Sequence, residues 1–441
     1  MHYLCSQMRQ LRLKYGLWLL MLLGGLNIFA QTRSFTLPTD TADTWQVSLI
    51  TCGPGVEVYN QFGHSAIRMK NDSLGIDLIY NYGIFSFDTP NFELRFTLGQ
   101  TDYLLGIQDY KDFVAWYAYC NRDVREQVLN LSVEEKNTLI GLLNENYKPQ
   151  NRMYRYNYFY DNCATRPRDL IEKCLQGELI YAEDMTTTDT GESFRSIVHE
   201  FTANNAWSQF GIDLCLGSEA DKPISRRLMM FIPLYLEKYF ATAKKQFPSG
   251  ELTVTSRGTD SSLRGDNELR SRELSDEVKP LVAQSKALVV IPEAKKALQD
   301  TPLTPFRCFT LLFIVVTALT IYGIKYRKSL WGLDLALFAL AGVAGCMLAF
   351  LASFSEHPTV SPNYLLLLFQ PLHLLLLPWF IRKVKRMQRS RYLVALTIEL
   401  SLFIVLWAVI PQSFPLGVLP LALCLLIRSA SNWLLSQYRK A

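Results

Sequence analysis

The chain has 441 residues, of which 49% are hydrophobic and 19% are charged, and its formal net charge is +5. Charges nearly vanish from long stretches after about Arg307, whereas residues 31–300 have the composition of an ordinary globular protein. This contrast excludes a wholly soluble protein, a disordered protein and a small disulfide framework. The basic residues concentrate beside apolar runs, which indicates membrane topology and no nucleic-acid partner.

Residues 1–30 are typical of a secretory signal peptide. Arg9, Arg12 and Lys14 precede an apolar run that ends at Ala30. Ile28, three residues before the expected cleavage point, is larger than usual, so an uncleaved signal anchor is the alternative. In both cases the sequence that follows is exported.

Residues 31–247 are expected to form the exported domain, which mixes strands and helices. The segment from Gln46 to about Gly83 is strand-rich, with turns at Gly53-Pro54-Gly55 and Asn71-Asp72-Ser73. Ser132 and Glu135 have the spacing of a capping box, which predicts a helix over 132–146. A tyrosine-rich strand over 154–160, a helix over 163–175 and amphipathic helices over 194–246 are expected next.

Residues 248–305 are interpreted as a polar linker followed by a helical segment. The stretch from Ser249 to about Lys279 is charged and poor in aromatic residues, which is typical of a linker or a mobile loop.

Residues 306–436 are predicted to form an all-α domain of five transmembrane helices. A bilayer is spanned by roughly 17 to 25 apolar residues. Five runs of suitable length follow one another: Cys308–Ile324, Leu330–Phe354, Asn363–Ile381, Tyr392–Ile410 and Phe414 to about Leu435.

The loops between these runs predict their orientation. Lys and Arg residues follow the first, third and fifth runs, whereas Ser355–Pro362 and Pro411–Pro415 carry none. By the positive-inside rule the basic loops and the C-terminus are cytoplasmic. Residues 31–306 then face the periplasm, and the chain is a multi-pass protein of the inner membrane.

Several ionisable residues lie in or near the predicted spans. Asp334, His373 and Glu399 are functional candidates because charge is costly in a membrane, although polar contacts between helices would also explain them. Glu356 and His357 lie in the second loop, at the mouth that faces the exported domain. We expect them to line a substrate path, with a helix cap or interfacial anchor as the alternative.

The exported domain contains five cysteines, so in an oxidising compartment at least one stays free or pairs outside the chain. Cys163 and Cys174 lie about 16 Å apart on one predicted helix, too far for a disulfide. The pairing of Cys52, Cys120, Cys174 and Cys215 is left open. No Cys-x-x-Cys occurs, so no zinc site and no cofactor are expected.

Cys163 is the candidate nucleophile, because it follows Asp161-Asn162 at a predicted helix N-terminus, where a thiolate is stabilised. Its base would be His64 or His199. The group that orients His64 would be Asp77, with Asn81 as the alternative. From spacing alone, a core histidine and a buried thiol are the favoured interpretation.

Cys52 is the rival nucleophile, since its Gly-Pro turn could hold it near His64. It ends a predicted strand, however, and lacks a helix N-terminus to activate it.

Four sequence blocks resemble the periplasmic domain of the Lnb-type lipoprotein N-acyltransferases, a family that also has a helical membrane part. They are Cys52-Gly53-Pro54-Gly55, Phe62-Gly63-His64-Ser65, Asn81-Tyr82-Gly83-Ile84-Phe85 and Asp161-Asn162-Cys163-Ala164-Thr165-Arg166. The order of His before Cys also resembles the circularly permuted papain-like fold of NlpC-type hydrolases and lecithin:retinol acyltransferase. The resemblance implies an α+β domain of that fold, with His64, Asp77 and Cys163 as catalytic residues.

The function implied by this resemblance is acyl transfer through a thioester on Cys163. A membrane phospholipid would be the donor, and the α-amine of a lipoprotein S-diacylglyceryl cysteine would be the acceptor. Support for the site, including the oxyanion hole, is expected from Asn162, Asp161, Asn81 and Arg166. The alternatives are an NlpC-like cell-wall amidase or endopeptidase, for which one anchor would suffice, and a non-catalytic membrane scaffold.

Overall fold

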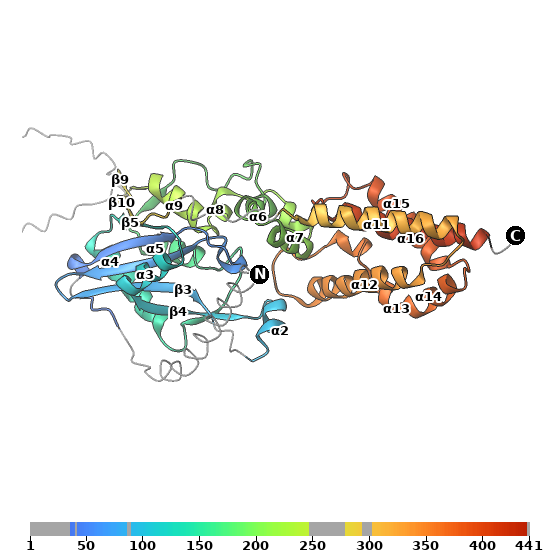
Figure 1. The fold of residues 1–441 in the computed structure, drawn as a ribbon. Coiled ribbons are helices and arrows are strands. Elements are labelled where there is room, and N and C mark those ends of the chain that lie inside the picture. The colour runs from blue at the N-terminus through green and yellow to red at the C-terminus, as the bar shows by residue number, and fades with distance from the viewer. Residues whose placement is uncertain (1–35, 40–41, 86–89, 247–277, 293–301, 439–441) are drawn as a thin grey trace, which may run out of the picture.

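The computed structural model describes residues 36–39, 42–85, 90–246, 278–292 and 302–438. Two regions lie end to end: a sheet domain, and a helical domain extending from one end of it (Figure 1). The expected signal peptide at 1–30 and most of the expected linker at 249–279 fall outside the described residues.

The sheet domain is built around seven strands in the order β10-β5-β1-β2-β3-β4-β6, and every neighbouring pair is antiparallel. A short second sheet joins β7, β8 and β9. The strand bounds are β1 Gln46–Cys52, β2 His64–Asn71, β3 Ile76–Ile84, β4 Asp102–Asp109, β5 Val124–Leu129, β6 Met153–Arg155, β7 Glu178–Ile180, β8 Lys244–Gln246, β9 Val278–Pro280 and β10 Val282–Val289.

Side chains alternate between the two faces of the sheet, and each face has its own core. Ile50, Ala66 and Ile79 pack under helix α3, together with Phe113 and Tyr117 of that helix. The opposite face packs against a larger cluster that includes α4 and α5. The helices of this domain are α2 Phe92–Thr97, α3 Tyr110–Tyr119, α4 Val133–Tyr147, α5 Thr165–Cys174, α6 Phe194–Thr202, α7 Ala206–Cys215, α8 Arg226–Met229 and α9 Pro233–Thr242.

Local sequence signals are confirmed where they are strong. The Ser132 hydroxyl accepts from the Glu135 backbone, and the Glu135 carboxylate accepts from the Ser132 backbone, which completes the predicted capping box of α4. The tyrosine-rich strand is shorter than expected, since β6 ends at Arg155 and an isolated bridge joins Asn157 to Asp161.

The segment interpreted as a linker and helix contains two strands instead. β10 pairs with β5 at the edge of the main sheet, so residues 282–289 belong to the sheet domain. Val282 and Leu288-Val289 favour a strand, and their partners lie more than 150 residues earlier in the chain.

The helical domain contains three helices that are long and apolar enough to cross a membrane: α11 Pro305–Lys325, α12 Trp331–Phe354 and α16 Val418–Gln437. Residues 364–375 and Leu377–Lys385 (α14) would make a fourth span only as one unit bent by 78°. This unit replaces the expected continuous third helix, because Pro371 and Pro378 interrupt the helix and divide it into η5 (Tyr364–Leu367), α13 (Leu372–Leu375) and α14.

The expected fourth span is also shorter than predicted. Helix α15, Arg391–Val405, has 15 residues. At a rise of about 1.5 Å per residue it extends about 22 Å, against roughly 30 Å for the hydrocarbon core.

The ionisable residues flagged in the predicted spans all have partners inside the domain. Both oxygens of Asp334 accept from Arg428, at 2.6 and 2.9 Å, and Thr320 accepts from the same guanidinium. His373 contacts the Tyr392 hydroxyl at 2.6 Å, and Glu399 accepts from Gln370 at 2.6 Å. The polar-contact interpretation therefore accounts for Asp334, His373 and Glu399.

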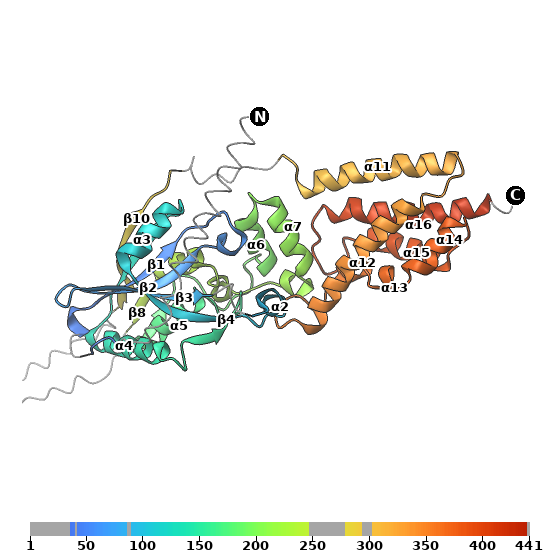
Figure 2. The same cartoon turned by 60° about the horizontal axis from the view of Figure 1, so that its bottom comes forward.

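The two domains meet through backbone hydrogen bonds in the loop after α12. Glu356 N donates to Leu98 O at 2.8 Å, and Gly217 N donates to Thr359 O at 2.7 Å. Figure 2 shows the short helix α2 beside this end of α12. The loop that was expected to face the exported domain is thus in direct contact with it.

Candidate active site

Cys163 lies in the turn that leads into α5, and the Asn162 side chain builds that turn. Asn162 Oδ1 accepts from the backbone N–H groups of Ala164 and Thr165, at 2.8 and 3.0 Å. Its Nδ2 donates to the carbonyls of Tyr158 and Phe231. Because the amide is fully engaged, Asn162 positions Cys163 and has no donor left for the expected oxyanion role.

The thiol of Cys163 faces the ends of β2 and β3. Gly83 lies next to Cys163: its φ of +91° favours glycine, and a Cβ there would be in ordinary van der Waals contact with the Cys163 Cβ, at 3.6 Å. Cys163 is only 8% exposed. Burial raises the pKa of its thiol, against hydrogen bonds from the Ser65 backbone and the Tyr156 side chain that lower it.

The expected thiolate is therefore not favoured at rest. Helix α5 begins at Thr165, two residues after Cys163, and the desolvation of the thiol outweighs the groups that would stabilise its charge. Ionisation of Cys163 requires a base.

His64 begins β2, next to Ser65, and its ring is held by Asn81. The distance from His64 Nε2 to Asn81 Oδ1 is 2.6 Å, and Asn81 Nδ2 donates to Gln108 at 2.9 Å. With its NH₂ group committed to Gln108, Asn81 presents its oxygen to His64, so Nε2 carries the proton and Nδ1 is the basic nitrogen.

Asp77, the first choice for orienting His64, lies far from the His64 ring. Asp77 pairs in register with Lys70, six residues along β2 from His64, or about 20 Å at the usual rise of a strand. Both of its oxygens accept from Arg68, at 2.7 and 2.6 Å. In the structure, the residue that contacts His64 is the alternative, Asn81.

His64 is kept neutral by its surroundings. Burial lowers its pKa to about 4, the hydrogen bond to Asn81 raises it in part, and the charge of Arg122 lowers it further. The ring stacks on Tyr117 of α3, with centroids 6.4 Å apart. Neutral imidazole is the form that can accept a proton.

Arg122 is a member of this site that the sequence did not reveal. Its Nε donates to Gly53 O at 2.8 Å, and its guanidinium lies over the Tyr117 ring. The side chain is buried, and Nη2 has no hydrogen-bond partner in the described part of the chain. Its charge is among the influences that lower the pKa of Cys163.

The rival nucleophile and the rival base are placed less favourably. Cys52 pairs with His64 across β1 and β2, but it is fully buried, and burial raises its pKa to about 12. His199 contacts Asp213 at 2.8 Å, in a cluster with Arg195. Cys163 and His64 therefore remain the candidate pair.

Asp161 and Arg166 brace the turn around Cys163 from outside. The Arg166 guanidinium donates to both Asp161 oxygens, at 2.6 and 2.8 Å, and lies 3.5 Å from the centre of the Tyr154 ring. These contacts indicate a supporting role.

Glu356 and His357 belong to the contact between the domains. The Glu356 carboxylate accepts from Gln100 and Arg155, at 2.8 and 2.9 Å. His357 Nε2 donates to Phe96 O at 2.6 Å. These bonds favour the anchor interpretation of both residues.

Aromatic rings connect this anchor with the thiol. The His357 ring lies 5.2 Å from that of Tyr158, and Tyr158 lies 5.5 Å from Tyr156, which bonds Cys163. Tyr156 was also missed as a site residue. Its signal was the run of tyrosines just before Cys163, which was interpreted only as a strand.

Two family models match the chain. The Lnb N-terminal periplasmic domain matches residues 34–194, which contain His64, Asn81 and Cys163. The Lnb transmembrane domain matches residues 296–440. No curated protein and no solved structure matches the chain. Because the two models together cover more than half of the 441 residues, the chain is a membrane protein that belongs to the Lnb family.

Proposed function

We propose that this protein is an enzyme, a lipoprotein N-acyltransferase that works through a thioester on Cys163. The donor is a membrane phospholipid, and the acceptor is the α-amine of a lipoprotein S-diacylglyceryl cysteine. The observation that carries the proposal is the buried Cys163, whose pKa is influenced by Ser65 and Arg122, together with the neutral His64–Asn81 pair that adjoins Ser65 and is also influenced by Arg122, in a domain joined to apolar helices. If both lipid substrates are held at one membrane surface, their reacting groups are already positioned near each other. The reaction then does not depend on a slow encounter between them.

In the first half-reaction the Cys163 sulfur attacks the ester carbonyl of the phospholipid. His64 Nδ1 takes the thiol proton as the carbon–sulfur bond forms, since burial keeps the thiol protonated until then. The ester carbon–oxygen bond breaks, and His64 returns the proton to the leaving lysophospholipid oxygen. The thioester and neutral His64 remain.

In the second half-reaction the neutral α-amine of the acceptor attacks the thioester. His64 takes one proton from the amine nitrogen and gives it to the departing sulfur, which restores the thiol. A carbon–nitrogen bond replaces the carbon–sulfur bond, and no cofactor is needed for the balance.

Tyr156 and the Ser65 backbone N–H are the proposed oxyanion donors. Both are among the groups that lower the pKa of the Cys163 thiol, so they lie near the carbon that the sulfur would attack. They take the place of Asn162, whose side chain is occupied by the turn.

The fold and the topology are proposed to follow the family resemblance. A strand His, a polar residue on the next strand and a Cys before a helix have the order of the permuted papain-like fold. We propose five passes through the inner membrane, with the third bent, and a cytoplasmic C-terminus. The loops at 355–362 and 411–415, which carry no Lys or Arg, support this side, since Gly217 hydrogen-bonds Thr359 and Gln412 hydrogen-bonds Leu216.

The test is lipoprotein analysis in cells that depend on Cys163→Ala protein. Triacylated lipoprotein should disappear, as it should with Cys163→Ser, whose hydroxyl ionises far less readily. Cys120→Ala is the matched control, because Cys120 lies at the end of α3 and should leave acylation intact. Normal triacylation in Cys163→Ala cells would refute the proposal, and an altered cell-wall peptide profile would favour the amidase alternative.

A further inference from the structure

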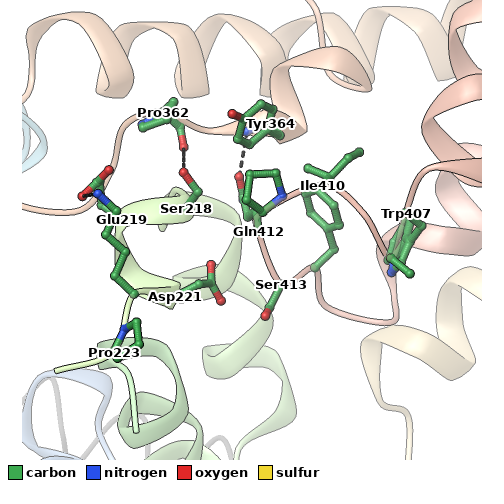
Figure 3. A pocket seen from close by; sticks show the side chains of 14 residues that line it. Ser218, Glu219, Asp221, Pro223, Pro362, Tyr364, Trp407, Ile410, Gln412 and Ser413 are labelled. Atoms are coloured by element: carbon green, nitrogen blue, oxygen red, sulfur yellow. Dashed lines mark hydrogen bonds and ion pairs between the residues drawn. The ribbon is translucent and has the colours of Figure 1, made fainter. Parts of the chain in front are cut away.

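A cavity lies away from Cys163, at the boundary between the two domains. It has a volume of about 800 Å³, within the range of small-molecule sites. Figure 3 shows Asp221 at the end of η4 (Ser218–Asp221) on one side and Gln412, Ser413 and Trp407 of the helical domain on the other. We call this cavity the junction chamber.

An apolar groove continues from the junction chamber along the helical domain. The groove has a volume of about 390 Å³ and shares Tyr364, Ile410 and Pro411 with the chamber. Ile398 and Leu402 of α15 line it at helical spacing and are more than half exposed. A polar chamber that opens into an apolar groove has the form required by a head group and an acyl chain.

The charges of the junction chamber favour a cation. Asp221 Oδ1 accepts from Arg195 at 3.0 Å, but Arg195 also pairs with Asp213 at 2.8 Å. Asp221 Oδ2 is buried and has no hydrogen-bond partner in the described residues. Lys222 forms an ion pair with Glu219 at 2.8 Å. The chamber therefore keeps one carboxylate charge in excess over the cations of the described residues.

Trp407 adds an aromatic surface to the chamber, and a ligand ammonium is attracted to such a ring. Lys222, at the rim, is suited to the phosphate of the same head group. An anionic head group without an ammonium would meet the unpartnered Asp221 oxygen and be disfavoured.

One residue that lines the chamber, Glu219, lies near Tyr160. Burial, and then the nearby Glu219 carboxylate, raise the pKa of Tyr160, three residues before Cys163. The Tyr160 ring also contacts Phe194, the neighbour of Arg195.

We infer that the junction chamber and its groove bind one phospholipid whose head group carries an ammonium, with the ammonium at Asp221 and an acyl chain between η5 and α15. Binding at this site does not require Cys163. It can therefore be measured on full-length Cys163→Ala protein, in which the proposed acyl transfer is removed.

The experiment is lipid titration of that purified protein, followed by native mass spectrometry. The probes are phosphatidylethanolamine and phosphatidylglycerol with identical acyl chains. One ethanolamine lipid should bind about tenfold more tightly than the glycerol lipid, the effect of one charged hydrogen bond. Asp221→Asn should reduce the preference.

Because Asp221 also pairs with Arg195, a second variant tests the site without touching that bond. Ser413 lines the chamber and is exposed, so Ser413→Lys adds a cation there, and Ser413→Gln is the neutral control. Ser413→Lys should abolish the preference for phosphatidylethanolamine, and Ser413→Gln should keep it. Equal binding of the two lipids by the parent protein, or an unchanged preference in Ser413→Lys, would overturn the inference.

Discussion

Buried polar groups in the two domains differ in whether they have hydrogen-bond partners. In the helical domain, Arg428 is 2% exposed and all three of its nitrogens have partners. Around Cys163, by contrast, Ser65 Oγ, Thr51 Oγ1 and Arg122 Nη2 are buried without partners in the described residues. Native proteins leave few such groups unpaired. The paired groups hold helices together. The unpaired groups have hydrogen-bonding capacity that a bound substrate could satisfy.

The largest effect should come from breaking the paired cluster. Asp334→Ala leaves Arg428 charged and buried, which should cost roughly 3–5 kcal/mol of stability. Asp334→Leu combined with Arg428→Met should recover most of the loss, since the uncompensated charge is then absent. Thermal unfolding in detergent measures both proteins. Equal destabilisation by the single and double changes would contradict the pairing argument.

A smaller loss is expected when the partner of His64 is removed. Asn81→Ala should reduce acyl transfer about 100-fold, because the ring then loses its tautomer and orientation. Asp77→Ala is the matched control on the same strand. It should leave the rate within about threefold and act on stability, through Arg68 and Glu126. Rates with a diacylated lipopeptide decide between them, and a larger effect of Asp77→Ala would restore the original assignment.

Arg122→Met should reduce transfer about tenfold, a loss of about 1.4 kcal/mol. It should also move the pH profile of Cys163 alkylation upward, because Arg122 lowers the pKa of that thiol. The stability cost should be about 1–2 kcal/mol, since the bond to Gly53 and the contact of the guanidinium with the Tyr117 ring are lost. A normal alkylation profile with a large loss of stability would make Arg122 purely structural.

The smallest effect should be that of mild acid. The pKa of His64 is lowered to about 4, so the base stays neutral and the rate of thioester formation, which does not involve the acceptor amine, should change little between pH 7.5 and 5.5. The rate should fall as pH falls through about 4, where His64 gains a proton. The His64 contribution to stability is lost earlier, as pH falls below about 6.5, because the unfolded chain binds that proton more tightly. An acid limb centred near 6.5 would show that His64 is not desolvated.

The sequence identified Cys163 and His64 because local blocks mark both residues. It could not rank Asp77 against Asn81 by alternation, since both point to the same face of β3. The hairpin could have done so: once the turn at Asp72–Gly75 sets the register, Asp77 is level with Lys70, far from His64. Arg122 was not foreseeable, because its contact with the site comes from pairing between β1 and β5.

The helical domain shows the same limit. Apolar composition located the three long helices, but it did not show that Pro371 and Pro378 bend the third predicted run, although prolines are the residues that do so. Strand β10 was missed because an edge strand is recognised by its neighbour, and that neighbour is distant in sequence.

The backbone hydrogen bonds between the domains bear on whether this sheet domain could be joined to the membrane domain of a related protein. Main-chain groups are common to all residues, so Leu98–Glu356, Gly217–Thr359 and Ser218–Pro362 impose few demands on side chains. Two glycines are the exceptions: a Cβ on Gly217 would collide with the Pro362 carbonyl, and one on Gly99 would lie 2.8 Å from His357 N. A chimera that joins this sheet domain to a related membrane domain should keep the same contact between the domains as long as those two positions stay glycine and Glu356 keeps its partners Gln100 and Arg155.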